Sequence, residues 1–160
     1  MAYQAERNAA IEAVLRACQL CQTVRAALVT ADTMAKKDKS PVTVADFGAQ
    51  AIISHQLAAA FPNDPLVGEE HAGDLEGADA AELRDRVLRS VQAVAPDMTE
   101  SQIVSAISRG THPGGGKARH WCLYPIDGTK GFLRGEQYAV ALALIEEGGP
   151  VLGVLGCPNL

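Results

Sequence analysis

The sequence is poor in several features that mark particular classes of protein. Only 4% of its 160 residues are aromatic, and the formal net charge is −5. The lack of a basic surplus argues against a nucleic-acid backbone as the partner, because binding many phosphates needs a positively charged face. No apolar run approaches the length of about 18 uncharged residues that a membrane span needs, so none is predicted.

Export signals are also missing, and cysteine is scarce. The first 20 residues carry charges throughout and lack a continuous apolar stretch, so no secretory signal is visible. We therefore expect a reducing, cytoplasmic setting. Of the four cysteines, Cys18 and Cys21 form Cys-x-x-Cys, without the turn or second pair that a redox or zinc site needs. We interpret them as small apolar residues on one helix face.

The sequence is rich in small and apolar residues with helical spacing. A hydrophobic share of 48% predicts a packed core, and the length fits one domain, 1–160. Residues 3–31 predict one long helix, whose apolar stripe comprises Ile11, Val14, Leu15, Cys18, Cys21, Val24 and Leu28. A second helix is predicted to begin between Thr43 and Asp46 and to end near Ala60, with Ala49, Ile53, Leu57 and Phe61 on its buried side.

Residues 71–120 have a different pattern, which we interpret as a helical insert followed by a loop. A polar stretch leads into an amphipathic helix near 83–94, and Thr99 with Gln102 has the spacing of a capping box. The later "GTHPGGGKARH" resembles a phosphate-binding loop only superficially. No strand precedes it, and Ala118 stands where a hydroxyl would bind magnesium, so we expect a mobile loop.

Four short segments predict strands. They are Leu66–Glu70, His120–Tyr124, Gln137–Ile145 and Val151–Cys157, the last two joined by a hairpin turn at "EEGGP". Helices grouped against hairpin-connected strands predict an α+β fold, with layered helices packed on a largely antiparallel sheet. Because both sides of Gln137–Ile145 are apolar, we expect both sheet faces to be covered. Nothing follows the last strand to cover it, which indicates an incomplete chain.

Acidic residues at loops and strand ends could carry chemistry. Asp46, Glu69, Glu70 and Asp127 offer the carboxylate oxygens that Mg²⁺ prefers, and paired ions can orient a water in phosphoryl transfer. In "LYPIDGTKGFLRG", Gly128 permits a tight turn whose amides can face a phosphate, and Thr129 adds a hydroxyl. Asp46 could take a proton from Thr129, which could in turn orient the attacking water.

Each of these residues also has a structural interpretation. Asp46 could cap the first turn of the second helix, and Glu69–Glu70 could be a solvated strand end. "IDGT" alone is an ordinary turn, because Asp-Gly is common in turns. His55 is expected on a helix surface, and the other histidines lack metal-ligand spacing.

Three ordered motifs together resemble the magnesium-dependent, lithium-sensitive phosphomonoesterase superfamily that includes inositol monophosphatase. They are "SPVTVADFGAQ", "VGEE" and "WCLYPIDGTKGF". Within it, the continuation "GTKGFLRG" and the long insert are similar to the 3′(2′),5′-bisphosphate nucleotidase branch. The resemblance implies the inositol-monophosphatase-like fold, Mg²⁺, and a small nucleotide bisphosphate as substrate. The implied reaction is release of the 3′-phosphate of adenosine 3′,5′-bisphosphate, giving AMP, in sulfate assimilation.

The resemblance also implies roles for single residues. Glu69, Asp127 and the carbonyl of Ile126 would be metal ligands, with Glu70 a weaker candidate. Asp46 and Thr129 would activate water, and Gly128 with Thr129 would contact the substrate phosphate.

Two departures from the family pattern bear on activity. Tyr124 occupies a position where the family has an aspartate ligand, and a phenol with an ordinary pKa near ~10 supplies only one weak oxygen. The carboxyl-terminal half, with a further aspartate and the nucleotide-binding groups, is absent. We therefore expect negligible activity from this chain alone. The alternatives are a non-catalytic fragment or pseudoenzyme, and a phosphatase acting on inositol polyphosphates.

Overall fold

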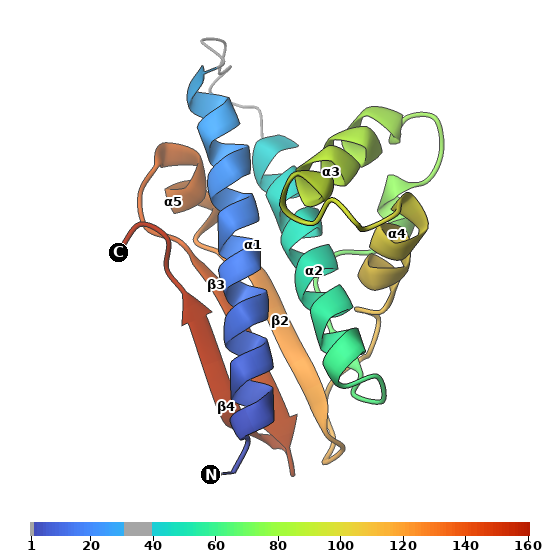
Figure 1. Cartoon of the computed structure of the whole chain (residues 1–160), viewed down its shortest axis with the longest axis vertical. Helices are drawn as coiled ribbons and strands as arrows, with labels where there is room; N and C mark the ends of the chain where they lie inside the picture. Colours follow the sequence, from blue (N-terminus) through green and yellow to red (C-terminus); the bar gives the residue numbers. More distant parts are fainter. Residues whose placement is uncertain (1, 31–39) are drawn as a thin grey trace.

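Helices lie in layers on one face of a four-stranded sheet in this computed structural model, which describes residues 2–30 and 40–160 (Figure 1). The elements in chain order are α1 (Gln4–Thr30), α2 (Ser40–Ala60), β1 (Leu66–Val67), η1 (Ala72–Leu75), α3 (Ala81–Val94), α4 (Glu100–Ser108), β2 (His120–Asp127), α5 (Thr129–Arg134), β3 (Ala139–Glu146) and β4 (Gly149–Gly156). The predicted α+β class is confirmed.

The sheet has the strand order β1-β2-β3-β4. The short β1 runs parallel to β2, whereas β2–β3 and β3–β4 are antiparallel, as the prediction of a largely antiparallel sheet requires. The predicted hairpin between β3 and β4 is confirmed. Its central residues, Glu147 and Gly148, have φ of 51° and 81°, which is the left-handed pair of a type I′ turn.

Helix α1 presents mainly small residues to the rest of the protein. Val14, Cys18 and Cys21 of the predicted stripe are buried, and the two cysteines are free thiols in the core, as interpreted from the sequence. Ile11 and Leu15 were wrongly placed in the stripe: their exposed fractions are 41% and 64%. Three alanines are fully buried instead (Ala10, Ala13 and Ala17). Small side chains let α1 lie close to the sheet. The Leu28 side chain, predicted in the stripe, and residue 31, the predicted helix end, lie outside the described part of the chain.

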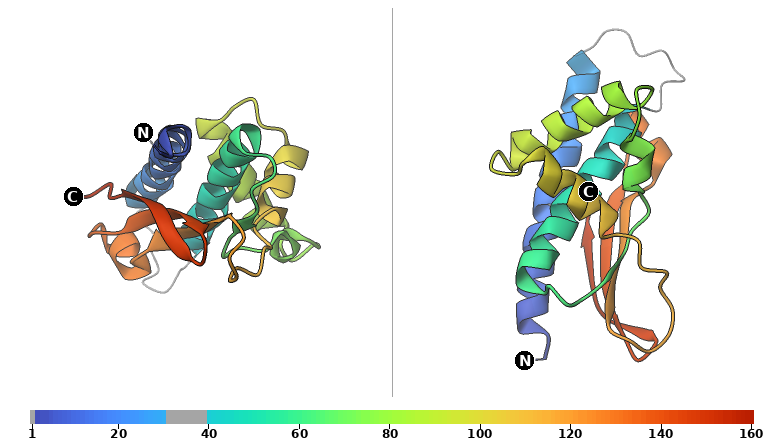
Figure 2. Two further views of the ribbon diagram at one scale, coloured as in Figure 1. Left: turned by 90° about the horizontal axis from the view of Figure 1, so that it is seen from below. Right: turned by 90° about the vertical axis from the view of Figure 1, so that its right-hand side faces the viewer.

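Helix α2 is buried on two sides, which explains its almost continuous apolar sequence. Ala49, Ile53 and Leu57 face the core between α1, α2 and the sheet, as predicted. Phe47 and Ile52 face a second core shared with α3 and α4. Figure 2 shows α2 between the sheet and these outer helices. The helix begins at Ser40, earlier than predicted, because a proline in the first turn is tolerated.

The predicted insert contains the two expected helices. The capping box is confirmed, since the Thr99 side chain accepts from Gln102 N–H while the Gln102 side chain accepts from Thr99 N–H. A 3₁₀ turn, η1, lies in the stretch expected to be a loop. After α4, Thr111 pairs with Val67 and His112 N–H donates to Leu66 O, so the following loop starts fastened to β1.

The two faces of the sheet differ in how they are covered. Helices α1 and α2 pack on one face, where Trp121, Val140 and Leu144 are fully buried (Figure 2). The other face is open among the described residues: Tyr124 is 47% exposed and Leu155 is 70% exposed. The expectation that both faces are covered is therefore wrong for this chain.

One glycine of β4 is required by the packing of α1. A Cβ at Gly156 would lie only 2.4 Å from Cys18 Sγ, whereas a Cβ at Gly153 would meet nothing within 4 Å. The close approach of α1 to β4 therefore requires a glycine at Gly156 but not at Gly153, which faces the open side.

Arg119 joins three segments that are distant in the sequence. Its guanidinium makes ion pairs with Glu6 at 3.1 Å, Asp64 at 2.8 Å and Glu146 at 2.9 Å, and it lies over the Phe61 ring. These four charged residues are the arginine cluster below. The cluster fixes the start of α1 and the end of β3 to the loop before β1.

None of the helices in the described ranges combines the length and the apolar character that crossing a membrane requires.

Candidate metal and phosphate site

Three carboxylates from two separate segments converge at one end of the sheet. Asp46 lies six residues after the start of α2, and Glu69 and Glu70 follow β1 after Gly68. One oxygen from each lies within 4.8 Å of the others. These three residues form the acidic cluster. Because Asp46 lies beyond the first turn of α2, the alternative that it caps this helix is wrong.

The acidic cluster is electrostatically unfavourable without a cation. Burial, then the charges of Glu70 and Glu69, raise the pKa of Asp46 to about 8. Burial and the neighbouring Glu69 raise the pKa of Glu70 to about 7, although His71 opposes this shift. Burial also raises the pKa of Glu69. Within residues 2–30 and 40–160, no lysine or arginine forms an ion pair with the cluster.

The donor set of the acidic cluster fits a hard divalent cation. Three carboxylates within reach of one point are the oxygen ligands that Mg²⁺ takes, leaving further positions for water. Burial, followed by the neighbouring like charges, raises the pKa of Asp46 and of Glu70, and a bound cation would favour the ionised form of both. The residues present therefore fit the metal that the sequence motifs imply.

The last residues of β2 pair irregularly with β3. The pairing of β2 with β3 shifts between Tyr124 and Asp127, and Pro125 and Ile126 have no partner on β3. The Ile126 side chain is a buried hydrocarbon, so within this residue only the main-chain carbonyl could act as a metal ligand. Asp127 is exposed and, among the described residues, is not a member of the acidic cluster.

Gly128 and Thr129 start a helix that the sequence interpretation missed. Gly128 has a φ of 93° and is the N-cap of α5, and Thr129 is its first residue. The predicted turn is therefore a strand end followed by one and a half turns of helix. Gly131 allows α5 to lie against the residues that precede β3, because a Cβ at this position would lie 1.9 Å from Gln137 O.

Tyr124 lies within electrostatic range of the carboxylates. The charge of Glu69, followed by partial burial and the charges of Asp127 and Asp46, raises the pKa of its hydroxyl. The structure thus brings Tyr124 near both acidic segments, on the open face of the sheet. At neutral pH its phenol remains protonated and brings no charge to a cation.

Gln50 was missed in the sequence interpretation. It is fully buried one turn after Asp46, and its side-chain amide makes four hydrogen bonds near Glu69 and Glu70. The signal in the sequence was a lone amide between Ala49 and Ala51 on a helix that is otherwise apolar there. Such a residue needs buried partners, because an unpaired buried amide is costly.

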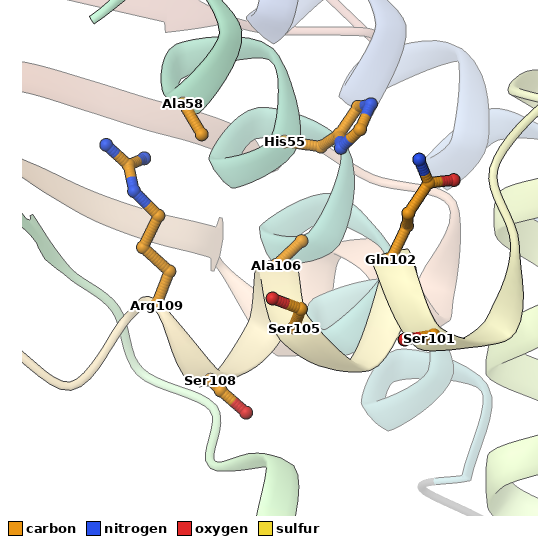
Figure 3. Close-up of a pocket in the computed structure, with 8 residues that line it drawn as sticks. All are labelled: His55, Ala58, Ser101, Gln102, Ser105, Ala106, Ser108 and Arg109. Atoms are coloured by element: carbon orange, nitrogen blue, oxygen red, sulfur yellow. The ribbon is translucent and has the colours of Figure 1, made fainter. Parts of the chain in front are cut away.

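A hollow of about 540 Å³ lies away from the acidic cluster, between α2 and α4. Figure 3 shows its lining, in which His55 and Ala58 come from α2 and three serines come from α4. No carboxylate lines it. Arg109 donates to the carbonyls of Ser54, Phe61 and Asp64, so its guanidinium is already hydrogen-bonded within the protein. This hollow therefore lacks the groups for metal or phosphate chemistry.

The chain is similar to known proteins over its whole length. The chain matches the inositol monophosphatase family over residues 2–160. It is 47% identical to 3′(2′),5′-bisphosphate nucleotidase 1 of Arabidopsis thaliana over 170 residues, covering 100% of this chain and 48% of the relative. It is 46% identical to 3′(2′),5′-bisphosphate nucleotidase of Schizosaccharomyces pombe over 174 residues, covering 100% and 49%.

A Candida albicans relative, 3′(2′),5′-bisphosphate nucleotidase 2, is 43% identical over 172 residues, covering 99% of this chain and 48% of the relative. The chain thus spans about half the length of the curated relatives it matches. The family match extends over nearly every residue and includes all three motifs that carry the predicted site residues. The chain therefore belongs to the inositol monophosphatase family.

Proposed function

We propose that residues 1–160 form the amino-terminal metal- and phosphate-binding part of a 3′(2′),5′-bisphosphate nucleotidase, with 71–120 as its helical insert. The single observation that carries this proposal is the convergence of Asp46, Glu69 and Glu70 within 4.8 Å. A nucleotide-binding second half would complete the enzyme. The substrate would be adenosine 3′,5′-bisphosphate and the product AMP, formed in the cytoplasm during sulfate assimilation.

The proposed metal ligands are Glu69, Asp127 and the carbonyl of Ile126, with Glu70 as a further candidate. When bound, Mg²⁺ would neutralise these carboxylates and stabilise charge on the phosphoryl oxygens, and lithium would inhibit by competing for the site. The family membership and the acidic donor set support the metal requirement.

The remaining residues would handle the proton and the phosphate. Asp46 would accept the proton of the Thr129 hydroxyl, and Thr129 would orient the attacking water. The N–H groups at Gly128 and Thr129 would hold the phosphate, which the left-handed φ of Gly128 supports.

Tyr124 favours a second candidate, in which this chain binds metal weakly and does not catalyse. A phenol replaces a charged ligand, and the hydroxyl gives a cation no compensating charge at neutral pH. On this proposal, the chain by itself would show negligible turnover.

A fusion to the second half of the Arabidopsis relative tests both candidates. We expect no Mg²⁺-dependent phosphate release from adenosine 3′,5′-bisphosphate by this chain alone or by the fusion carrying Tyr124. We expect the fusion with Tyr124→Asp to gain activity that lithium inhibits. Turnover by the unmodified chain would contradict the expected impairment, and no gain in the Tyr124→Asp fusion would contradict the assigned ligand position.

Turnover of two substrates by a full-length relative that carries this amino-terminal half separates a third candidate, a phosphatase of inositol polyphosphates. The measurement is phosphate release from inositol 1,4-bisphosphate and from adenosine 3′,5′-bisphosphate at equal concentrations. A higher kcat/KM for the inositol substrate would favour the third candidate over the nucleotidase.

A further inference from the structure

We infer that Gln50 is a positioning residue that fixes the main chain of Glu69 and Glu70, so that their carboxylates meet Asp46. This inference rests on the proposed function, because it concerns the geometry of the proposed metal site. Gln50 has no carboxylate and does not belong to the acidic cluster. It acts through the peptide that carries two members of that cluster.

Three of the four hydrogen bonds of the Gln50 side chain go to the main chain of Glu69 and Glu70. The backbone N–H groups of Glu69 and Glu70 both donate to Gln50 Oε1, at 3.0 and 2.9 Å. Gln50 Nε2 donates to the carbonyl of Glu70 at 2.8 Å. Because these bonds hold the peptide before and after the Glu70 Cα, they limit the directions in which both side chains can leave the turn.

Gln50 shares its helix with Asp46, one turn away. Residues four apart on a helix lie on the same face. The helix that supplies one carboxylate therefore also supplies the clamp for the other two. This arrangement ties the separation of Asp46 from Glu69 and Glu70 to one rigid element rather than to the flexibility of a loop.

Two glycines leave room for the Gln50 amide, and a side chain at either position would collide with it. A Cβ at Gly68 would lie 2.6 Å from Gln50 Oε1, and a Cβ at Gly110 would lie 2.5 Å from Gln50 Nε2. Gly68 N–H also donates to Gly110 O at 2.9 Å. The glycine preceding Glu69 in "VGEE" is therefore required by the approach of a side chain from α2.

The same amide reaches the end of α4. Gln50 Nε2 donates to Ile107 O at 3.1 Å, so one side chain holds α2, the Glu69–Glu70 segment and the insert together. The insert thereby contributes to the geometry of the acidic cluster without supplying a ligand. Residues that orient the carriers of metal ligands commonly affect metal affinity almost as much as the ligands themselves.

The first test uses the unmodified, metal-free chain and needs no variant. Amide hydrogen exchange measured by NMR should show the Glu69 and Glu70 N–H groups protected by about 100-fold or more over a free peptide, although they lie outside any helix or strand. A scalar coupling across the hydrogen bond from either amide nitrogen to the Gln50 side chain would identify the acceptor. Exchange of both amides at free-peptide rates would overturn the inference.

The second test compares three variants of the chain in Mn²⁺ binding followed by electron paramagnetic resonance. Gln50→Met keeps the volume but removes all four hydrogen bonds, and we expect a loss of about 10-fold or more in Mn²⁺ affinity. Gln50→Glu keeps the two bonds accepted from Glu69 and Glu70 N–H, and it should restore protection of these amides. The control is Gln56→Met, on the same helix, where Gln56 Oε1 has no hydrogen-bond partner among the described residues.

The outcomes separate positioning from a loss of folding and from a failure of the proposed function. A folded Gln50→Met variant with Mn²⁺ affinity equal to that of the Gln56→Met control would overturn the inference. If Gln50→Met does not fold, the exchange measurement on the unmodified chain decides. If the unmodified chain binds no Mn²⁺ while both amides are protected, the proposed metal site fails and the clamp by Gln50 stands.

Discussion

The acidic cluster and the arginine cluster each gather three carboxylates from segments far apart in the sequence. In the arginine cluster, Arg119 pairs with all three, and Tyr3 donates a further hydrogen bond to Glu146 at 2.6 Å. The acidic cluster has no arginine or lysine paired with it in the ranges that the structure describes.

The carboxyl groups respond in opposite directions. Hydrogen bonds from Tyr3 and Arg119 hold the pKa of Glu146 below its ordinary value, whereas burial and like charges raise the pKa of Asp46 to about 8. The carboxylates of the arginine cluster have an internal counter-ion in Arg119. Those of the acidic cluster repel one another, and an external cation would offset this repulsion. The difference indicates that carboxylates stabilise the fold when their counter-ion is internal, and are available to an external cation when it is not.

Removing the internal cation should have the largest effect. Arg119→Ala would leave Glu6, Asp64 and Glu146 close together without a partner, at a cost of about 3 kcal/mol in the free energy of unfolding. Urea denaturation measures this. The matched control is Arg16→Ala, whose pair with Glu12 is exposed and at 3.9 Å, and which should cost less than about 0.5 kcal/mol. Equal effects of the two substitutions would contradict the assigned role of Arg119.

The acidic cluster should make the metal-free chain less stable as the pH rises. Because the folded-state pKa values of Asp46 and Glu70 lie above their ordinary values, the folded chain binds more protons between about pH 4 and about pH 8. Stability is therefore fully present below the ordinary pKa and falls as the pH rises through this window. Urea denaturation with a chelator, at about pH 5 and about pH 8, checks the sign.

Adding Mg²⁺ at the higher pH should reverse this loss, by about 1.4 kcal/mol at ten times the dissociation constant. Stability that rises between the two pH values, or that ignores Mg²⁺, would count against the acidic cluster as a cation site.

Adding a carboxylate to the acidic cluster should strengthen its cation binding. Tyr124→Asp brings a fourth carboxylate to the acidic cluster, and we expect Mg²⁺ affinity to rise about 10-fold, which equals about 1.4 kcal/mol. Isothermal titration calorimetry measures it, with Tyr124→Phe as the control that removes only the hydroxyl. If both substitutions leave the affinity unchanged, Tyr124 does not occupy a ligand position.

The smallest expected effects have opposite signs in the two clusters. Without metal at about pH 8, Asp46→Asn should raise the free energy of unfolding by about 1 kcal/mol, because it removes repulsion. Asp64→Asn should lower it by about 1 kcal/mol, because it weakens a pair with Arg119. Thermal unfolding of both variants in one buffer is the measurement, and equal signs would remove the distinction between the clusters.

Much of the fold could be predicted because its signals are local. The long periodic helices, the capping box at Thr99 and the hairpin at Glu147–Gly148 depend on neighbouring residues, and the structure confirms them. Local patterns failed where burial depends on distant partners. The stripe of α1 favoured Ile11 and Leu15 for their size, but the sheet selects alanines, which permit closer contact.

Candidate site residues were visible for a different reason. Asp46, Glu69 and Glu70 stand out as acidic residues beside apolar segments, and the structure brings these three together. For Gln50 the sequence offered only a lone amide in an apolar stretch, and for Arg119 it offered no signal, because the roles of both residues depend on distant partners.

By itself, the sequence determined the helices, the hairpin and the presence of carboxylates at the ends of apolar segments, because these follow from residue spacing and turn chemistry. Only the tertiary structure decided which carboxylates share a cation. Arg119 reaches residues 6, 64 and 146, whereas Asp46 meets Glu69 and Glu70 across a clamp made by Gln50. The physical reason is that electrostatic interactions depend on distance in space, and chain packing sets that distance.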